Sequence, residues 1–411
     1  MTDADRTYVI VGGGLAGAKA AETLRAEGFA GRVVLFGEET VRPYERPPLS
    51  KGYLLGKEGL DKVFVHGEEW YADNDVDLQL ARAVDSIDLD GKEVSAGGTR
   101  VGFDKLLLVT GSVPRRLDVD GADLEGVLYL RRLGDSEAIR GAIAGGGKRV
   151  VVVGAGWIGL ETAAAARMYG NYVTIVEPQP TPLYAVLGPE MGEVFAALHR
   201  EHDVDLRLGE GVGSLIGLDG HVASAMTSHG EELPADIVIV GVGIRPLVDL
   251  GQAAGLEVDN GILTDQALRT SHRDVFAAGD VASSYNPLFG RRLRVEHWAN
   301  ALNGGPAAAR SMLGQDETYD RVPYFYSDQY DLGMEYSGFA MPGDYDEVVV
   351  RGDAAEREFV AFWLAKGRVL AGMNVNVWDV NEAIQALVRS GAVVDRKRLA
   401  DPDVPLEELV G

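Results

Sequence analysis

The sequence predicts an α/β protein with two doubly wound domains, each built on a parallel sheet, and a smaller C-terminal α+β domain. Two observations lead to this fold class. The turn G-x-G-x-x-G occurs twice in the 411-residue chain, each time between a run of β-branched residues and an Ala-rich stretch. After about residue 322 the pattern changes, and residues 345–351 and 358–364 alternate between apolar and polar, which is typical of antiparallel strands.

The first repeat reads as strand, turn, helix and strand over residues 8–11, 12–17, 18–26 and 32–36. Here each glycine has a mechanical role: the first allows a tight turn, the second lets a phosphate approach the backbone, and the third lets helix and strand pack closely. The N–H groups at the start of the helix then attract phosphate oxygens. The residues of this predicted cradle are Gly12, Gly14, Leu15, Ala16 and Gly17.

The second repeat has the same order, with strands at 150–153 and 173–177 on either side of the turn at 154–159 and its helix. Two copies in this context predict two Rossmann-like domains that bind two dinucleotides, so that electrons can pass between them. The residues of the second predicted cradle are Gly154, Gly156, Trp157, Ile158 and Gly159.

The remaining elements follow from shorter patterns. Buried-type strands are expected at 105–109, 236–240 and 274–278, each ending at a glycine-containing turn. In the C-terminal domain, strands are expected at 345–351, 358–364 and 369–377, followed by a helix at 380–389. The predicted domains are residues 1–114 with 244–322, residues 115–243, and residues 323–411.

Composition excludes several classes of protein. The net charge of −24 and the pI near 4.7 disfavour nucleic-acid binding, which needs a basic face. The absence of cysteine excludes disulfides, thiolate metal sites, iron–sulfur ligation and Cys-x-x-Cys redox chemistry within the chain. No apolar run approaches the ~20 residues of a membrane span. The short acidic start, Met1 to Asp5, does not look like a targeting peptide, so a cytoplasmic protein is expected.

An acidic residue after each turn is the expected ligand of an adenosine ribose. In the second repeat this residue is Glu177, and residues 178–188 contain no Arg or Lys that could accept a 2′-phosphate. We therefore expect NADH to be preferred over NADPH; the alternative is a solvated acid at a strand end. In the first repeat Gly37 stands at the expected position, so Glu38 is the candidate.

These motifs, together with Val109-Thr110-Gly111 and the segment from Thr264 to Asp280, resemble the FAD/NAD(P)-dependent reductases of the glutathione-reductase structural type. Residues 42–51, Arg-Pro-Tyr-Glu-Arg-Pro-Pro-Leu-Ser-Lys, narrow the resemblance. They resemble the ferredoxin reductases of bacterial oxygenase systems, the group of putidaredoxin reductase and biphenyl dioxygenase reductase, which is related to apoptosis-inducing factor.

The resemblance implies FAD on the first cradle and NADH on the second. It implies that Asp280 accepts a hydrogen bond from the ribityl chain of FAD, although Asp280 could also serve as a helix N-cap. Thr110 and Gly111 would mark where the chain passes the flavin. The other residues that it implies near the cofactors are Arg46, Lys51, Gly243, Glu296 and Trp298.

The family pattern also implies that Lys51 and Glu161 form an ion pair beside the reactive nitrogen of the flavin. A cation there stabilises the negative charge that a hydride brings, and the carboxylate orients the cation. The alternatives are a surface lysine and a favourable acid in the first turn of a helix.

The chain lacks three features that related reductases or metalloproteins can have: tryptophans near the flavin, a metal site and a thiol relay. Tyr324 and Tyr326 stand where such reductases often have Trp, although Ser327-Asp328-Gln329 is retained. His199 and His202 have one-face helical spacing, but without further ligands they are expected at a solvated helix end, and no metal site is expected. Without cysteine a thiol relay is excluded, so electrons should leave the flavin directly.

The function expected from these features is NADH-dependent reduction of a ferredoxin that serves an oxygenase such as a cytochrome P450. Two alternatives stay open: a redox-sensing flavoprotein like apoptosis-inducing factor, and a diaphorase that uses small acceptors. The chain is expected to be a monomer or a homodimer. The candidate basic residues for docking an acidic ferredoxin are Arg291, Arg292, Arg310, Arg396, Lys397 and Arg398.

Overall fold

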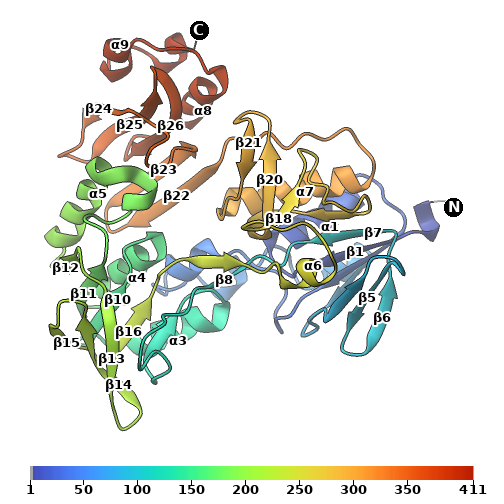
Figure 1. Cartoon of the computed structure of the whole chain (residues 1–411), viewed down its shortest axis with the longest axis horizontal. Helices are drawn as coiled ribbons and strands as arrows, with labels where there is room; N and C mark the ends of the chain where they lie inside the picture. Colours follow the sequence, from blue (N-terminus) through green and yellow to red (C-terminus); the bar gives the residue numbers. More distant parts are fainter. Residues whose placement is uncertain (1–2, 411) are drawn as a thin grey trace. The chain divides into compact units, whose positions relative to one another are not determined.

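The first glycine-rich turn lies at the carboxyl edge of a five-stranded parallel sheet. The computed structural model describes residues 3–410, so Met1 and Thr2 of the acidic N-terminus lie outside the described residues, as does Gly411. Figure 1 shows the whole chain in sequence colours. The chain divides into two units. Unit 1 contains residues up to 45, 59–113 and 244–323, and unit 2 contains 46–58, 114–243 and the chain from 324 onward.

The sheet of unit 1 has the strand order β19-β7-β1-β2-β3, and every neighbouring pair is parallel. This sheet and its first helix confirm the strand, turn, helix and strand predicted at the first repeat. The element bounds are β1 (Thr7–Val11), α1 (Leu15–Ala26), β2 (Arg32–Phe36), α2 (Trp70–Asp73), β3 (Val76–Gln79), β7 (Lys105–Leu108) and β19 (Val275–Ala277).

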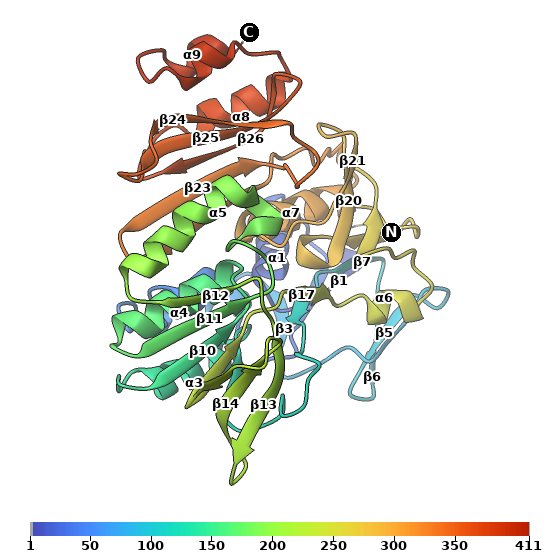
Figure 2. The ribbon, with the colours of Figure 1, turned by 60° about the vertical axis from the view of Figure 1, so that its left-hand side comes forward.

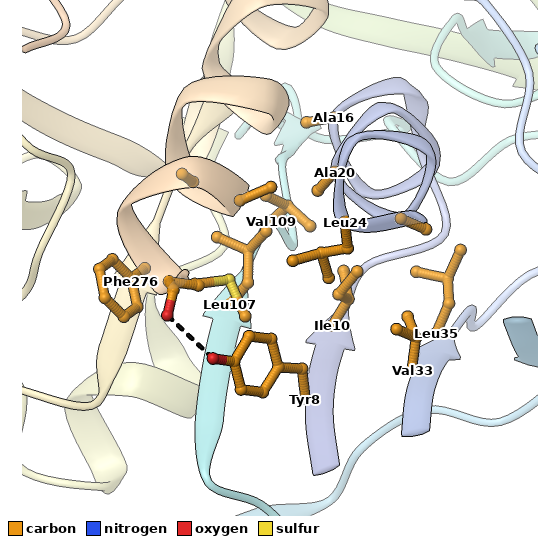
Figure 3. Close-up of a cluster of buried hydrophobic side chains, with 14 of the residues drawn as sticks. Tyr8, Ile10, Ala16, Ala20, Leu24, Val33, Leu35, Leu107, Val109 and Phe276 are labelled. Carbon is orange, nitrogen blue, oxygen red and sulfur yellow. Dashed lines mark hydrogen bonds between the residues drawn. The ribbon is translucent and has the colours of Figure 1, made fainter. Parts of the chain in front are cut away.

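One face of this sheet is covered by α1 and α7 (Trp298–Met312). Figure 3 shows the buried cluster between the sheet and these helices, in which Ile10 and Leu107 of the sheet face Leu24 of α1. The hydroxyl of Tyr8 donates to the carbonyl of Met312 at 3.0 Å, so its buried polar atom is paired. Each fully buried large apolar side chain stabilises the fold by about 1.5–3 kcal/mol, which holds the sheet edge and its turn in place.

The other face of the sheet packs on a small antiparallel sheet and a short helix. A further sheet, in the order β18-β20-β21, completes unit 1. Their bounds are β4 (Ser86–Asp88), β5 (Glu93–Ala96), β6 (Thr99–Gly102), α6 (Asp249–Ala253), β18 (Ile262–Thr264), β20 (Ala282–Asn286) and β21 (Arg291–Leu293).

Unit 2 begins with a second five-stranded parallel sheet, in the order β12-β11-β10-β16-β9. It carries the second glycine-rich turn between β10 and α4, as predicted. An antiparallel sheet, β13-β14-β15, packs beside it. The bounds are β9 (Val127–Tyr129), α3 (Leu133–Ile143), β10 (Arg149–Val153), α4 (Trp157–Met168), β11 (Tyr172–Glu177), α5 (Tyr184–Glu201), β12 (Asp205–Leu208), β13 (Val212–Leu218), β14 (His221–Thr227), β15 (Glu232–Pro234) and β16 (Ile237–Val240).

The C-terminal part of unit 2 is an antiparallel sheet in the order β22-β23-β26-β25-β24. Figure 2 shows α8 on one side of this sheet and α5 on the other. The indole of Trp363 in β25 donates to the carbonyl of Leu187 in α5 at 3.1 Å. The bounds are β22 (Tyr324–Gln329), β23 (Leu332–Gly338), β24 (Glu347–Asp353), β25 (Glu358–Ala365), β26 (Arg368–Val375), α8 (Asn381–Ser390) and α9 (Arg396–Ala400).

Three of these five strands and α8 match the expected segments, but β22 and β23 were not expected. Two of the inward positions of β22 hold the polar residues Ser327 and Gln329, so the strand lacks the apolar alternation that predicts burial on one face. Along β23 all residues but one are buried, so it shows no alternation. No helix in the described part of the chain combines the length and the apolar character that a bilayer crossing needs.

Candidate functional site

The first turn has the geometry of a phosphate cradle. A Cβ added to Gly12 would lie 2.1 Å from the carbonyl oxygen of Val109, and one added to Gly17 would lie 2.2 Å from that of Gly12. A Cβ at Gly14 would meet no atom within 4 Å. The fold itself therefore requires the first and third glycines, whereas the second keeps open the space at the start of α1, where Leu15 and Ala16 begin the helix. This geometry fits a dinucleotide pyrophosphate.

A pocket of about 190 Å³ lies beside this turn in unit 1. Gly12, Glu38, Arg82 and Thr110 are among the residues that line it. The structure thus brings the predicted acid Glu38 to the same pocket as the first glycine. Arg82 was not predicted, because no motif surrounds it and it follows a different strand, β3. A carboxylate and a guanidinium in one pocket suit a ribose and a phosphate.

Asp280 lies in a short 3-10 turn, Gly279–Val281, and is followed directly by β20. The alternative that Asp280 caps an α-helix is therefore wrong: Ala278 precedes the turn, and the chain continues as a strand. The hydroxyl of Ser112 donates to the carboxylate of Asp280 at 2.7 Å. The hydroxyl of Thr110 donates to the carbonyl of Leu247 at 2.8 Å, which ties the Thr110-Gly111 segment to the returning chain.

The segment before α7 also lies in unit 1. Trp298 is the first residue of α7, as expected, and its indole N–H donates to the carboxylate of Glu45 at 3.0 Å. Glu296 forms an ion pair with Arg294 at 2.5 Å. Burial lowers the pKa of the neighbouring His297 to about 4.

The second turn repeats the geometry of the first. A Cβ on Gly154 would lie 2.5 Å from the carbonyl oxygen of Gly241, and one on Gly159 would lie 2.1 Å from that of Gly154. A Cβ on Gly156 would again meet no atom within 4 Å. The two cradles therefore match glycine by glycine, each in its own sheet, and the second also fits a pyrophosphate.

Two side chains of this turn differ in their surroundings. Trp157 packs edge-on against Phe195 and Phe325, with ring centroids 5.5 and 5.1 Å away, so its side chain belongs to the core of unit 2. Ile158 is 40% exposed. Gly243 has a φ of +95°, which favours glycine at the end of the unit.

Glu177 lies at the end of β11, next to the second turn. Its carboxylate accepts the backbone N–H of Ala155 at 2.7 Å and that of Gln179 at 2.9 Å. Both oxygens thus hold the turn and the following loop in place, and each oxygen keeps a further lone pair for a ribose hydroxyl.

Lys51 and Glu161 meet in unit 2 although they lie 110 residues apart in the chain. The Lys51 ammonium lies 2.6 Å from Oε1 of Glu161, and the two side chains are 15% and 3% exposed. The hydroxyls of Ser50 and Ser327 also donate to this carboxylate. The alternatives of a surface lysine and a favourable first-turn acid are wrong, because Lys51 is mostly buried, Glu161 is buried, and Glu161 is the fifth residue of α4.

Side chains of β22 lie next to the pair of Lys51 and Glu161. The ammonium of Lys51 lies 5.4 Å from the ring centroid of Tyr326, within the range of a cation–π interaction. The hydroxyl of Tyr324 donates to the carboxylate of Glu335 at 2.7 Å, and burial raises the pKa of Tyr324. Burial also raises the pKa of Asp328, with Lys51 acting in the opposite direction.

The expectation of a solvated helix end at His199 is wrong. His199 is fully buried at the end of α5, where its Nε2 lies 2.9 Å from Oε1 of Gln329. The one-face spacing of the two histidines reflects packing: His202 stacks on Tyr330 with ring centroids 3.6 Å apart. Among residues 3–410, no group of three or more His, Asp or Glu side chains is placed to hold a metal ion.

Several of the basic docking candidates have partners within their own unit. Arg310 pairs with Glu27 at 3.1 Å, and Arg292 donates to the carbonyls of Thr264 and Ser283. Arg396 pairs with Glu347 at 3.1 Å and Arg398 with Glu408 at 3.6 Å. Lys397 is exposed; the backbone N–H groups of Arg398 and Lys397 lower the pKa of the Asp395 carboxyl, and the nearby charge of Lys397 lowers it further. The remaining predicted residue, Arg46, donates to the carbonyl of Arg131.

Two family models together cover nearly the whole chain: pyridine nucleotide-disulphide oxidoreductase over residues 6–305 and reductase C-terminal over residues 324–410. The chain is 39% identical to the ferredoxin–NAD(+) reductase component of the anthranilate 1,2-dioxygenase system of Burkholderia cepacia, over 97% of this chain and 98% of that protein. It is 36% identical to putidaredoxin reductase of Pseudomonas putida, over 99% and 97%.

A solved structure agrees with these sequence comparisons. The covalent complex of putidaredoxin reductase with putidaredoxin contains a chain that matches with a TM-score of 0.95 and 35% identity, over 99% of this chain and 98% of that one. The resemblance inferred from the motifs is thus confirmed over the full length. The chain belongs to the ferredoxin reductases within the pyridine nucleotide-disulphide oxidoreductase family.

Proposed function

We propose that this protein is an FAD-dependent NADH:ferredoxin oxidoreductase that supplies an oxygenase system. The observation that carries the proposal is the pair of cradles, which match glycine by glycine in two separate parallel sheets. One polypeptide with two such cradles suits a bound flavin dinucleotide and a second dinucleotide that exchanges. The relatives named above are reductases of the same kind, two of them serving the anthranilate dioxygenase and putidaredoxin systems.

We assign FAD to residues 1–114 with 244–322, NADH to residues 115–243, and the third domain to residues 323–411. The first assignment is supported by the pocket in which Glu38 and Arg82 lie beside Gly12. Glu38 would accept the ribose hydroxyls, and the N–H groups at Gly14 would hold the pyrophosphate. Asp280, already paired with Ser112, would accept from the ribityl chain.

The second assignment is supported by Glu177, whose carboxylate already caps the turn of the NADH cradle. Its negative charge would repel a 2′-phosphate, and no Arg or Lys lies in residues 178–188 to offset that repulsion. We therefore expect NADH to be the working donor rather than NADPH.

Lys51 and Glu161 are the proposed catalytic pair. Bound flavin supplies the redox chemistry, since it takes up a hydride and returns electrons one at a time. Lys51 would place its ammonium beside the reacting ring, and the buried carboxylate of Glu161 fixes the direction of that ammonium. A cation fixed in advance stabilises developing charge without reorganising at the moment of transfer.

The electrons must leave without a thiol, because the chain has no cysteine. The proposed partner is a ferredoxin, and the proposed docking residues are Arg291, Arg292, Arg310, Arg396, Lys397 and Arg398. Of these, Lys397 is exposed, so it is available to an acidic partner. The other proposed residues near the cofactors are Leu15, Ala16, Gly17, Arg46, Thr110, Gly111, Trp157, Ile158, Gly159, Gly243, Glu296 and Trp298.

The test is steady-state turnover of the FAD-loaded protein with NADH and a panel of [2Fe–2S] ferredoxins. We expect rapid, saturable ferredoxin reduction that requires NADH. Slow NADH oxidation with a long-lived long-wavelength absorbance and no ferredoxin turnover would support a redox sensor instead. Turnover with quinones or dyes but with no ferredoxin of the panel would support a diaphorase.

A further inference from the structure

A line of buried polar side chains in unit 2 leads from α5 to Glu161. Nε2 of His199 lies 2.9 Å from Oε1 of Gln329, and Nε2 of Gln329 lies 3.2 Å from Oγ of Ser327. Oγ of Ser327 lies 2.7 Å from Oε1 of Glu161. These four residues are 0%, 1%, 0% and 4% exposed, so water does not compete for their hydrogen bonds.

The donors in this line all point toward Glu161. The Ser327 hydroxyl has one proton, and it donates that proton to Glu161, so it can only accept from Gln329. Gln329 must then present its amide N–H₂ to Ser327 and its carbonyl oxygen to His199. The carbonyl only accepts, so the proton of the His199 ring is on Nε2. Burial lowers the pKa of His199 to about 4, which makes the ring neutral at pH 7 and leaves it this single donor.

The line ends at a carboxylate that is held from two sides. Oε1 of Glu161 accepts from Ser327 and Lys51, and Oε2 accepts from Ser50. Donors on both oxygens prevent the carboxylate from turning about its terminal bond. The orientation of Glu161 toward Lys51 is thus determined by donors from two separate segments of the chain, residues 50–51 and Ser327.

Ser327 and Gln329 occupy inward positions of β22, where apolar side chains would give a more stable sheet. Buried polar groups cost free energy unless they are fully hydrogen-bonded. A polar line on the inward side of a sheet therefore indicates a function in the chemistry of the group at which it ends.

We propose that Ser327, Gln329 and His199 are positioning residues that hold the carboxylate of Glu161 in the orientation that fixes Lys51. The proposal rests on the proposed function, because it assigns the line to the hydride-transfer step. None of the three residues touches the nicotinamide or the flavin in this proposal. They act through Glu161.

The test is a double-mutant cycle between Ser327→Ala and Glu161→Gln in the FAD-loaded protein. The readouts are the rate constant of flavin bleaching by NADH in stopped flow and the midpoint potential of the bound flavin. A hydrogen bond to a charged group is lost in Ser327→Ala, so we expect bleaching to slow by about 10-fold. In the Glu161→Gln background the charge is absent, so the same change should slow it only about 2- to 3-fold.

Ser337→Ala is the matched control. Ser337 is fully buried in the neighbouring strand β23, and its hydroxyl also stands between two carboxamide groups, those of Asn381 and Gln385. It should leave the bleaching rate and the midpoint potential unchanged. Ser327→Thr keeps a hydroxyl and should recover most of the rate lost in Ser327→Ala.

Equal slowing by Ser327→Ala in both backgrounds, or no slowing in either, would overturn the proposal. If Ser327→Ala does not fold, Gln329→Met replaces it in the cycle, since this change removes the amide donor to Ser327 and introduces no charge. If the wild-type flavin is not bleached by NADH, the proposed function fails. The midpoint potentials of the bound flavin then still decide whether Ser327 and Glu161 are coupled. If the shift in the double variant equals the sum of the shifts in the two single variants, the proposal is contradicted. If it differs from that sum, the coupling that the proposal requires is supported.

Discussion

Replacing Gly156 by alanine should separate folding from nucleotide binding at the second cradle. Gly156 has a φ of −77° and a ψ of −179°, which alanine adopts without strain, and the added Cβ meets no atom within 4 Å. A Gly-to-Ala change at such a position alters stability by only about 0.4–1 kcal/mol, and the weaker N-cap offsets part of any gain. The variant should therefore fold and bind FAD like the wild type.

The same methyl group would occupy the space through which a pyrophosphate reaches the start of α4. Each charge-assisted hydrogen bond lost there costs about 1.5–3 kcal/mol, which is roughly a 10- to 150-fold rise in the Kd of NADH. The assay is a titration with NAD⁺ followed by flavin absorbance, together with the FAD content and the melting temperature of each protein.

Gly154→Ala is the contrasting variant. Its Cβ would lie 2.5 Å from the carbonyl oxygen of Gly241, and its φ of +97° is strained for alanine, so we expect a clear loss of stability. An unchanged nucleotide Kd in Gly156→Ala would refute the placement of the pyrophosphate, and a loss of FAD from the same variant would reverse the assignment of the two cradles.

Three further predictions follow from single features. Glu177→Gln should raise the KM for NADH about 10-fold, because the charge-assisted contact with the ribose is lost. It should also narrow the preference for NADH over NADPH, measured as the ratio of kcat/KM values, because the repulsion of the 2′-phosphate is lost. An unchanged ratio would contradict the ribose role. Asp274→Asn should destabilise the protein at pH 7 by about 1–3 kcal/mol, because Asp274 is buried and its carboxylate pairs with Lys92 at 2.6 Å and Lys105 at 2.8 Å. Burial raises the pKa of Asp274, but the hydrogen bonds from Lys105 and Lys92 outweigh burial and hold this pKa well below its usual range. The difference in unfolding free energy between the wild type and Asp274→Asn should therefore be full above about pH 5 and shrink as the pH falls below about 4. A difference that does not depend on pH in denaturant titrations would contradict this pairing. Changing Arg396, Lys397 and Arg398 to Glu should raise the KM for ferredoxin about 10-fold at low salt and leave ferricyanide reduction unchanged; unchanged values of both would place the docking site elsewhere.

The elements that could be predicted from the sequence are those whose pattern is local. The two glycine turns carry their structural context within about 30 residues, since strand, turn and helix follow one another directly. β22 could not be predicted in this way, because Ser327 and Gln329 are polar residues at inward positions and hide the period of two. The same line of polar groups explains the error at His199, which was expected in solvent because its partner Gln329 lies 130 positions away in the chain.

In the candidate site, too, some residues could be predicted from sequence motifs and others could not. Lys51 and Glu161 were identified through family resemblance, and their 2.6 Å contact confirms that they pair, although their role toward the flavin stays a prediction. Ser50 lies within the motif of residues 42–51, but no role was predicted for it, and the structure shows that it is a second donor to Glu161. The position of Arg82 in the first pocket carried no signal in the sequence. An arginine outside a motif is usually a surface residue, and only the fold brings this one to a site.

The central claim is that hydride enters from NADH and leaves as single electrons for a ferredoxin. Its most direct measurement is the anaerobic stoichiometry of the FAD-loaded protein with a [2Fe–2S] ferredoxin in excess, in which NADH is added in known amounts and both chromophores are followed. We predict two ferredoxins reduced per NADH, with the flavin returning to its oxidised spectrum. Persistence of a long-wavelength flavin–NAD band while the ferredoxin stays oxidised would contradict the claim.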